Sequence, residues 1–162
     1  MKVIILGKDG QLGQCLSEQF ASAEHELHTT TYTTQLFAKS ECDLSNFQQL
    51  HEMFLTQAPD VIVNAAAYTA VDAAEDNAQL ADTLNHKAVS HLAKLCREFD
   101  STLIHISTDY VFDGRGNTPY SESEPTGPQG VYGVTKLSGE HAVTASKCKH
   151  IIIRSAWIFS EH

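Results

Sequence analysis

The sequence predicts an α/β fold, with a doubly wound, Rossmann-like and mostly parallel sheet and helices on both of its faces. Short apolar runs rich in β-branched residues alternate with helical patterns along the chain, which is typical of βαβ units. Most of these runs are apolar enough to be buried on both faces, as parallel strands are. A turn rich in glycine joins the first run to the first helical pattern, as at the first βα turn of doubly wound sheets.

Size and charge limit the classes of protein to consider. With 162 residues, the chain is expected to form a single domain, 1–162, with one core. Its formal charge of −9 argues against a nucleic-acid partner. The longest apolar run near the N-terminus, residues 3–6, is too short for a signal sequence or a membrane span. We therefore expect a cytoplasmic protein with no membrane partner.

Cysteine and histidine give no pattern of metal ligands. The 4 cysteines are scattered and form no Cys-x-x-Cys pair, so we expect reduced thiols. The tightest histidine pair, His25 and His28, falls in a predicted strand, where a spacing of three places the side chains on opposite faces. A metal site built from the histidines is not expected.

Six segments are predicted as strands from their apolar, β-branched composition. Five of them are residues 2–6, 25–31, 61–64, 102–107 and 150–155, and a weaker candidate spans 37–42.

Three segments have helical patterns, at residues 12–22, 46–57 and 77–99. The second is expected to begin with a capping box of Ser45 and Gln48 and to stop before Pro59. The third repeats apolar residues on one face that should cover the sheet. That face consists of Leu80, Leu84, Ala88, Leu92, Leu95 and Phe99.

Two further segments have distinctive composition. Asp72 and Glu75 look like a pair of carboxylates, but their spacing favours helix capping. Residues 113–130 are dense in glycine and proline and are predicted to form a loop. Loops of that length in a compact domain are usually functional or mobile.

The glycine-rich turn, Gly7-Lys8-Asp9-Gly10-Gln11-Leu12-Gly13, has the form G-x-x-G-x-x-G before a helix. Glycines let the backbone approach a pyrophosphate, whose charge is met by the N–H groups of the helix N-terminus. We interpret it as a dinucleotide site, with a plain tight turn as the alternative. Residues 28–34, at the expected end of the second strand, hold neither the acid nor the Arg that would select NADH or NADPH. Cofactor preference is therefore left open.

Two other segments are candidates for contact with a cofactor. Asp43 and Leu44 follow the weaker strand candidate, where the carboxylate would either accept a hydrogen bond from an adenine amino group or cap the next helix. Ala65, Ala66 and Ala67 come at the carboxyl end of a central strand, where ligands of open α/β sheets bind. Their small side chains let a cofactor lie against the backbone, and close helix packing is the alternative.

Tyr132 and Lys136 are candidates for proton transfer because residues four apart share one face of a helix. A nearby ammonium is expected to lower the pKa of the phenol from about 10. Thr108 would hydrogen-bond the same carbonyl oxygen that Tyr132 protonates. Trp157, the single tryptophan, would either stack on a sugar or base or cover the core.

In combination these motifs resemble the dTDP-4-dehydrorhamnose reductase family of extended short-chain dehydrogenases/reductases, over essentially the whole chain. The resemblance implies NAD(P)H-dependent reduction of the 4-keto group of dTDP-4-dehydro-6-deoxy-L-mannose, giving dTDP-L-rhamnose for polysaccharide. The motifs that carry it are Gly7-x-x-Gly10-Gln11-Leu12-Gly13, the run Asn64-Ala65-Ala66-Ala67-Tyr68-Thr69-Ala70-Val71-Asp72, Ser107-Thr108-Asp109-Tyr110-Val111-Phe112-Asp113-Gly114, and Tyr132-Gly133-Val134-Thr135-Lys136-Leu137-Ser138-Gly139-Glu140.

The resemblance also implies a role for individual positions. Thr108, Tyr132 and Lys136 would be the catalytic residues, with Lys136 also reaching the nicotinamide ribose. The other implied contacts are Gly10, Gln11 and Leu12 with the pyrophosphate, Asp43 and Leu44 with the adenine end, Ala67 and Thr69 with the cofactor, and Thr108, Asp109 and Trp157 with the sugar nucleotide.

The chain departs from the family pattern in two places. Some members carry a glutamate that binds magnesium two residues after the third glycine, and Cys15 stands there in this sequence. The resemblance therefore does not carry a magnesium requirement to this chain. The family also continues into a C-terminal substrate region that this sequence lacks, so we expect cofactor binding with weak or no reductase activity. The unpaired sheet edge would favour a homodimer.

Three other functions are compared with this one. A nucleotide-sugar dehydratase would need an acid where Tyr110 stands. Another nucleotide-sugar epimerase or reductase is an alternative, although an epimerase fits the run from Ser107 to Phe112 less well. A non-catalytic regulatory subunit of the same fold, like that of methionine adenosyltransferase, is another alternative. The intact Thr108, Tyr132 and Lys136 argue against it.

Overall fold

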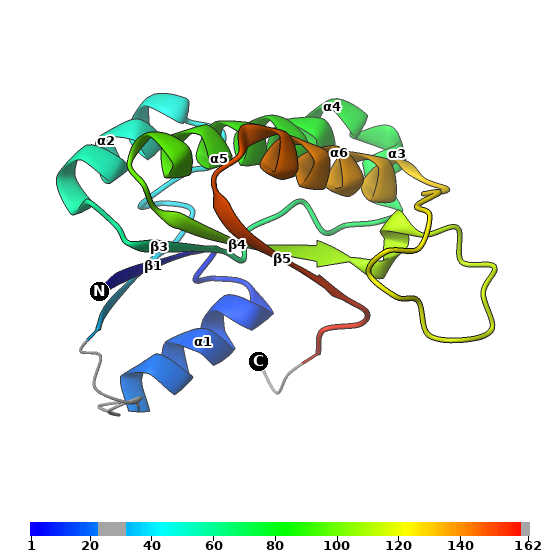
Figure 1. Ribbon diagram of the computed structural model, residues 1–162, viewed down its shortest axis with the longest axis horizontal. Coiled ribbons are helices and arrows are strands. Elements are labelled where there is room, and N and C mark those ends of the chain that lie inside the picture. The colour runs from blue at the N-terminus through cyan, green and yellow to red at the C-terminus, as the bar shows by residue number, and fades with distance from the viewer. Residues whose placement is uncertain (23–31, 160–162) are drawn as a thin grey trace.

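The structure, a computed structural model, describes residues 1–22 and 32–159. In these residues one five-stranded sheet runs through the molecule in the order β2-β1-β3-β4-β5 (Figure 1). Every pairing between neighbouring strands is parallel, which confirms the predicted parallel sheet. The strands are β1 Lys2–Leu6, β2 Thr33–Phe37, β3 Val61–Asn64, β4 Thr102–Thr108 and β5 Lys149–Ser155.

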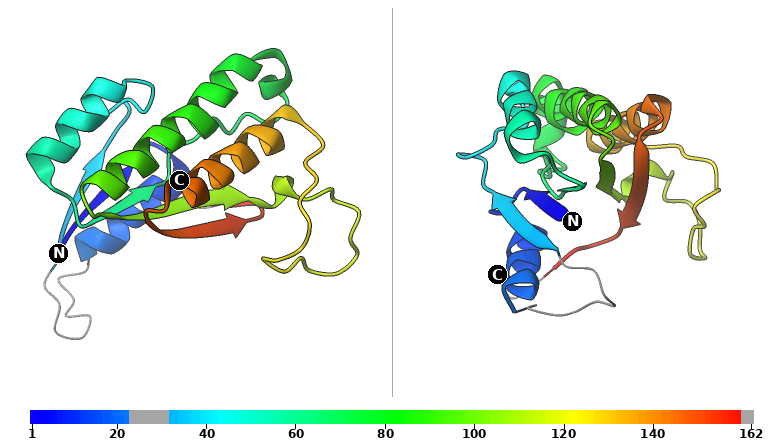
Figure 2. Two further views of the ribbon diagram at one scale, coloured as in Figure 1. Left: turned by 45° about the horizontal axis from the view of Figure 1, so that its top comes forward. Right: turned by 60° about the vertical axis from the view of Figure 1, so that its left-hand side comes forward.

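Helices cover both faces of the sheet, as the sequence predicts, but unequally (Figures 1 and 2). Helix α1 Gln11–Ser22 lies on one face, whereas α2, α5 and α6 lie on the other. These three span Phe47–Gln57, Ala88–Glu98 and Val131–Ser146, and shorter elements are α3 Ala73–Asp76, α4 Ala78–Asp82, the π-helical turn η1 Thr83–Lys87 and the 3-10 turn η2 Asp109–Val111.

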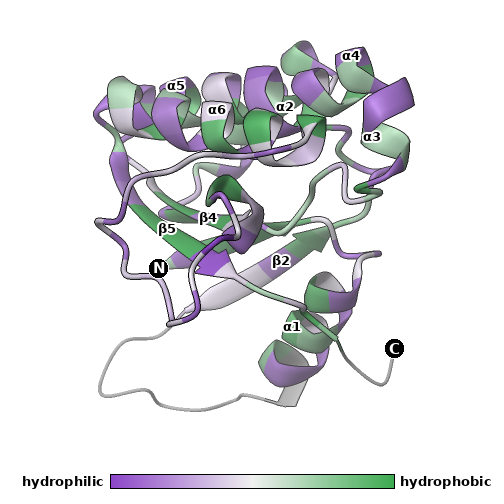
Figure 3. Cartoon of the chain, turned by 90° about the vertical axis from the view of Figure 1, so that its right-hand side faces the viewer, coloured by the Kyte–Doolittle hydropathy of each residue, from purple (hydrophilic) through white to green (hydrophobic). Residues whose placement is uncertain are grey.

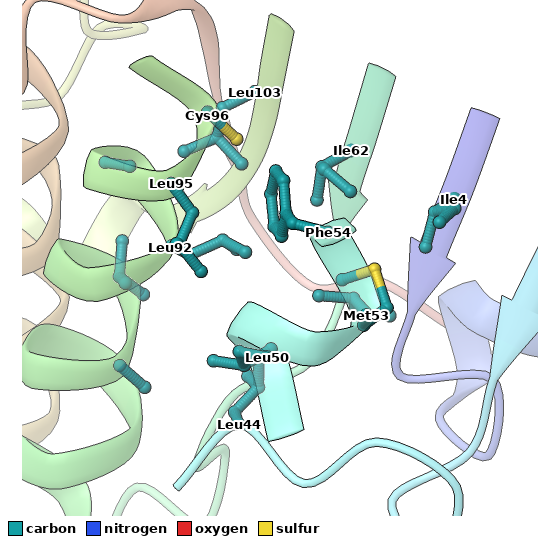
Figure 4. Packing of buried hydrophobic residues seen from close by; sticks show 14 of the residues in the cluster. Ile4, Leu44, Leu50, Met53, Phe54, Ile62, Leu92, Leu95, Cys96 and Leu103 are labelled. Atoms are coloured by element: carbon teal, nitrogen blue, oxygen red, sulfur yellow. The ribbon is translucent and has the colours of Figure 1, made fainter. Parts of the chain in front are cut away.

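The core has a larger and a smaller part, one on each face of the sheet. The larger part fills the space between the sheet and α2 and α5, where Phe54, Leu92 and Leu103 are fully buried (Figure 4). Burying side chains of this size contributes about 2 kcal/mol each. Alternate residues of β1 enter the two parts, with Ile4 in the larger and Ile5 in the smaller. Strand β1 is therefore buried on both faces, as predicted.

The edge strand β5 does not share that double burial. Ile151 and Ile153 are 53% and 45% exposed, because no helix in the described part of the chain covers that side of β5. Hydrophobic stretches run along β4 and β5, whereas α1 shows alternating hydrophobic and hydrophilic bands (Figure 3). An amphipathic helix of this kind buries one face against the sheet.

The second strand differs from the one that the sequence indicated. The segment predicted first, 25–31, lies outside the described residues, as do its two histidines. The weaker candidate, 37–42, is wrong: the N–H groups of Glu41 and Cys42 both donate to the carbonyl of Ala38 and close a turn. Strand β2 is instead Thr33–Phe37, which pairs with β1 along its whole length. Pairing with a buried neighbour decided the position of this weakly patterned strand.

The N-cap of helix α2 lies one residue later than predicted. Asn46, not Ser45, is the N-cap, since its Oδ1 accepts a hydrogen bond from the N–H of Gln49 at 3.1 Å. The Ser45 hydroxyl donates to Asp43 instead. The predicted stop before Pro59 is confirmed, with Ala58 in the left-handed region as the C-cap.

The long third helix contains a turn that regular periodicity does not predict. The π-helical turn η1 inserts an extra residue between α4 and α5, which rotates the face on either side of it. Leu92 and Leu95 are buried as predicted, whereas Leu80 is 48% exposed, so that part of the predicted apolar face is wrong.

Residues 113–130 contain no helix or strand, which confirms the predicted loop. No helix among the described ranges is both long and apolar enough to span a membrane.

Candidate active site

A cavity of about 890 Å³ opens at the carboxyl ends of β1, β3 and β4. The chain leaves β1 toward α1 on one face and leaves β3 toward the helices on the other face (Figure 1). Adjacent strands whose connections diverge in this way leave a crevice between them, where doubly wound folds bind ligands.

The cavity brings together nearly all the residues predicted from the sequence. Gly13 is the exception, because it packs inside the turn instead of lining the cavity. The predicted residues that line it are Gly7, Gly10, Gln11, Leu12, Asp43, Leu44, Ala65, Ala66, Ala67, Thr69, Thr108, Asp109, Tyr132, Lys136 and Trp157.

The glycine turn is held against β3 too tightly for side chains. Gly7 has a φ of +92°, and a Cβ there would lie 2.7 Å from the backbone nitrogen of Ala66. A Cβ at Gly13 would lie 2.0 Å from the carbonyl oxygen of Gly7. Gly10 meets only that oxygen, at 3.5 Å, so its outer surface is free for a ligand. A narrow backbone cradle that opens onto the N-terminus of α1 fits a pyrophosphate.

The end of this cradle that is predicted to meet adenosine has one carboxylate that sequence reasoning found and one lysine that it missed. Asp43 accepts hydrogen bonds from both the N–H and the hydroxyl of Ser45, at 2.8 and 2.7 Å. These bonds lower the pKa of Asp43 and fix its carboxyl group at the cavity wall. Lys39 is exposed, lines the cavity beside Asp43, and follows β2 by two residues. The sequence did not predict a strand at Thr33–Phe37, and correct bounds for β2 would have pointed to this position.

At the opposite end, β4 and α6 bring together the three residues predicted to be catalytic. Thr108 ends β4 and is 6% exposed, while Tyr132 and Lys136 come from the first two turns of α6. The Thr108 hydroxyl donates to Asp109 at 3.1 Å and accepts from the N–H of Tyr110 at 3.2 Å. All three side chains therefore face one cavity, although they are up to 28 positions apart in sequence.

The electrostatics of Tyr132 differ from the sequence expectation. Burial raises the pKa of its phenol, while a hydrogen bond with Thr108 opposes the rise and the charge of Asp109 adds to it. Lys136 is 2% exposed, and its ammonium donates to the carbonyl of Ile106 at 2.6 Å. The expected lowering of the phenol pKa by Lys136 is therefore wrong in this structure. Burial is the largest cause of the shift, and the raised pKa keeps the phenol protonated at neutral pH.

Burial acts on Lys136 itself as well. It lowers the pKa of the ammonium to about 8, against the opposing charge of Glu140. A lysine of this kind exchanges its proton near neutral pH, as proton-transfer groups require.

Below the cavity, two buried polar residues support its alanine wall. Asn64 donates from Nδ2 to Nδ1 of His105 at 3.2 Å, and its Oδ1 accepts from the N–H of Ala66 at 3.3 Å. Burial lowers the pKa of His105 to about 3, so the ring is neutral and Nδ1 is free to accept. Asn64 was part of a sequence motif, but the sequence assigned it no role.

Glu75 caps a helix other than the one that the sequence indicated. Its Oε1 accepts from the N–H of Val131 at 2.8 Å, at the start of α6. Asp72 makes no side-chain cap bond. The predicted local cap is therefore wrong, and Glu75 instead fixes the helix that carries Tyr132. The two residues in contact are 56 positions apart, a separation that no local motif encodes.

No group of three or more metal-binding side chains occurs in residues 1–22 and 32–159. Cys15 is a free thiol on α1.

Comparison with known proteins identifies the fold family. Residues 1–162 match the family model described as the RmlD substrate binding domain. The chain belongs to this family. Its relatives include the dTDP-4-dehydrorhamnose reductase of Shigella flexneri, 40% identical over 164 residues, which cover 99% of the chain and 52% of that protein. The same enzyme of Mycolicibacterium smegmatis is 39% identical, over 98% of the chain and 46% of that protein.

Solved structures agree with this assignment to the RmlD substrate binding domain family. The crystal structure of dTDP-4-dehydrorhamnose reductase from Bacillus anthracis in complex with NADP has a TM-score of 0.90 and 34% identity. The match covers 99% of this chain and 55% of the Bacillus anthracis chain. The chain spans about half the length of the curated relatives that it matches.

Proposed function

We propose that this chain binds NADPH or NADH and reduces the 4-keto group of dTDP-4-dehydrorhamnose to dTDP-L-rhamnose. The observation that carries the proposal is the meeting of Thr108, Tyr132 and Lys136 at one end of a cavity with a glycine cradle at its other end. The names of the similar reductases, and the NADP in the Bacillus anthracis structure, support this reaction class. The substrate is a nucleotide sugar.

In this proposal Tyr132 is the general acid. The bound nicotinamide cofactor supplies the hydride to the carbonyl carbon. Tyr132 donates its proton to the carbonyl oxygen, and its raised pKa ensures that the proton is present at neutral pH. The Thr108 hydroxyl donates a hydrogen bond to the same oxygen, in place of its bond to Asp109. Lys136 holds the nicotinamide ribose and supplies the positive charge beside the phenol.

The remaining cavity residues bind the rest of the two ligands. Main-chain N–H groups at the start of α1 meet the pyrophosphate, because the helix N-terminus favours negative charge. Asp43 accepts from the adenine amino group. Asp109 and Trp157 contact the sugar nucleotide, with Trp157 83% exposed and therefore accessible for stacking on a ring.

We also propose a cytoplasmic location and a homodimer. The four cysteines are free, three of them buried, which fits a reducing compartment. The exposed isoleucines of edge strand β5 favour pairing with a second copy. A monomeric mass by light scattering at micromolar concentration would refute the dimer.

The test has two stages, so that binding and chemistry are separated. Fluorescence titration with NADPH measures the cofactor site first, and oxidation of NADPH in the presence of the dTDP-4-keto sugar then measures turnover. Replacing Tyr132→Phe is expected to lower kcat by at least about 100-fold, because the general acid is lost. NADPH affinity should change by less than about twofold, since the phenol is one contact among many.

Tyr32→Phe is the matched control, since Tyr32 packs against Phe20 outside the cavity and should leave turnover unchanged. Equal turnover of Tyr132→Phe and the unsubstituted chain would refute the assignment of the acid. NADPH binding without turnover, in a version of the protein that carries the C-terminal substrate region of the family, would favour the regulatory-subunit alternative, and a C4-epimerised product would favour an epimerase.

A further inference from the structure

Behind the cavity, a partly buried ion pair joins the helix, the strand and the loop that surround the three proposed catalytic residues. Glu140 is 4% exposed and lies on the same face of α6 as Lys136, one turn further along. Its carboxylate accepts from the guanidinium of Arg154 on β5, at 3.0 Å from Nε and 2.6 Å from Nη2. Its Oε1 also accepts from the hydroxyl of Ser107, at 2.5 Å.

The geometry of these contacts ties three elements together beside Thr108. Ser107 directly precedes Thr108 on β4, and Ser107 and Arg154 are register partners across β4 and β5. Glu140 therefore joins α6 to both strands at the level of the proposed catalytic threonine. A charge-assisted, two-pronged bond of this kind has a fixed geometry.

Arg154 extends the same connection to the loop of residues 113–130. Its Nη1 donates to the carbonyl of Glu122 at 3.2 Å, and its guanidinium lies 5.0 Å from the ring centroid of Phe112. The Phe112 ring stacks on Tyr120 with a centroid distance of 4.3 Å and an interplanar angle of 4°. A single arginine thus holds both the entry and the middle of the loop.

The loop also packs against the start of the helix that carries Tyr132. The N–H of Gly127 donates to the carbonyl of Val111 at 2.9 Å. A Cβ at Gly133, next to Tyr132, would lie 2.9 Å from Pro128 and still closer to the carbonyl of Tyr110. A shift of the loop would therefore act on α6 and on η2, which border the cavity.

Neither Glu140 nor Arg154 lines the cavity. They cannot touch a cofactor or substrate there, so any effect on the reaction passes through other residues. The ion pair is also poor at raising stability, because the cost of burying the Glu140 carboxylate offsets its attraction to Arg154, which is itself only partly buried. Retaining it here points to a role in fixing geometry.

We propose that Glu140 and Arg154 are positioning residues, which lock α6, the end of β4 and loop 113–130 into the arrangement that the reaction requires. The catalytic part of this inference rests on the proposed function, while the anchoring of the loop does not.

The loop offers a direct readout, because Arg115 is its single site for trypsin. Arg115 is exposed, and cleavage after it requires the loop to open. Arg154→Met and Arg154→Lys remove the bond to Glu122 and should increase the rate of this cleavage about tenfold under native conditions. Lys149→Met is the matched control, since Lys149 lies on the same strand as Arg154 and forms an exposed ion pair with Asp100. This substitution should change the rate by less than about twofold.

A double variant separates positioning from stability. Arg154→Met alone leaves the Glu140 carboxylate buried and unpaired, which destabilises the fold. Combining it with Glu140→Gln removes that charge and should return the midpoint of thermal unfolding toward the original value. Cleavage should remain fast, because the tether to Glu122 is still missing. Two outcomes would overturn the inference. In the first, cleavage of the double variant returns to the original rate together with stability. In the second, the rate of global unfolding measured in urea fully accounts for the faster cleavage.

Kinetics provides the second readout. Under the proposed function, the double variant should keep its NADPH dissociation constant within about twofold and lose at least about tenfold in kcat, since misplaced groups act on chemistry and not on the cradle. Unchanged kcat in the double variant would overturn the catalytic part. Failure of the unsubstituted chain to bind NADPH or to reduce the sugar would count against the proposed function alone, because the cleavage comparison uses neither ligand.

Discussion

At the end proposed to bind nucleotide, the cavity is walled by backbone and small side chains, whereas buried polar groups border the end proposed to be catalytic. In the cradle, Gly7 and Gly13 approach other main-chain atoms so closely that a single added carbon has no space. On the helix that carries Tyr132, by contrast, Lys136 and Glu140 are charged side chains with 2% and 4% exposure. The stability of the cradle should therefore be sensitive to added atoms. The stability of the catalytic end should be sensitive to charges that are removed or left unpaired.

The largest effect is expected from adding one carbon to the cradle. Gly13→Ala places a Cβ 2.0 Å from the carbonyl of Gly7, so the turn must open. We expect a loss of at least about 3 kcal/mol in the free energy of unfolding and loss of NADPH binding. Gly10→Ala is the control, since its Cβ meets only an ordinary contact at 3.5 Å. Gly10→Ala should keep its free energy of unfolding in urea and lose only affinity for NADPH. Equal stability of the two variants would contradict the expected sensitivity of the cradle to an added carbon at Gly13.

The catalytic end should respond to pH instead. The pKa of Lys136 falls from 10.5 to about 8 on folding, so between these values the folded state holds fewer protons than the unfolded state. Stability associated with this group therefore rises with pH from about 8 to about 10.5. Lys136→Met removes this titrating group, so its free energy of unfolding lacks this rise. The free energy of unfolding of Lys136→Met minus that of the unsubstituted chain should therefore fall by about 3 kcal/mol between pH 7 and pH 10.5.

Urea unfolding at several pH values measures this difference, and other titrating groups cancel between the two proteins. A pH-independent difference for Lys136→Met would mean that burial does not perturb this lysine.

A smaller effect is expected at the rim of the nucleotide end, where one charge stands beside the backbone cradle. Lys39 lines the cavity at the end of β2, the place where a basic side chain meets the 2′-phosphate of NADPH in this kind of fold. Lys39→Met should raise the NADPH dissociation constant about fivefold, equal to about 1 kcal/mol, and leave that of NADH unchanged. Added salt should reduce the difference, because Lys39 is exposed.

Lys8→Met is the comparison for this experiment, since Lys8 belongs to the same turn but does not line the cavity. Equal losses of NADPH affinity in the two variants would show a general charge effect and no specific site at Lys39.

The cradle and the catalytic residues also differ in how far sequence could predict them. The glycine turn is a local pattern, and its position between β1 and α1 is confirmed. Thr108, Tyr132 and Lys136 were found as motifs, and the structure brings them to one cavity. Their environment was not predictable, because the burial that raises the pKa of Tyr132 comes from packing against distant segments.

Errors in the predicted fold have the same origin. Strand β2 is weakly patterned and was not predicted at Thr33–Phe37, and Lys39 was missed with it. The π-helical turn before α5 changes the helical period without a marker in the sequence, so Leu80 was assigned to the wrong face. Contacts between distant residues, such as Glu75 with Val131 and Glu140 with Arg154, depend on the finished arrangement of elements.

The cavity draws its lining from Gly7, just after β1, to Ile158, beyond β5. A nucleotide bound there as proposed rewards folding of nearly the entire described chain, not of one part. At a free concentration 100 times its dissociation constant, such a ligand adds about 2.7 kcal/mol to stability and lowers the unfolded fraction about 100-fold. Because unfolded chains are the ones that proteases degrade, the cellular lifetime of this protein should rise and fall with the supply of nicotinamide nucleotide.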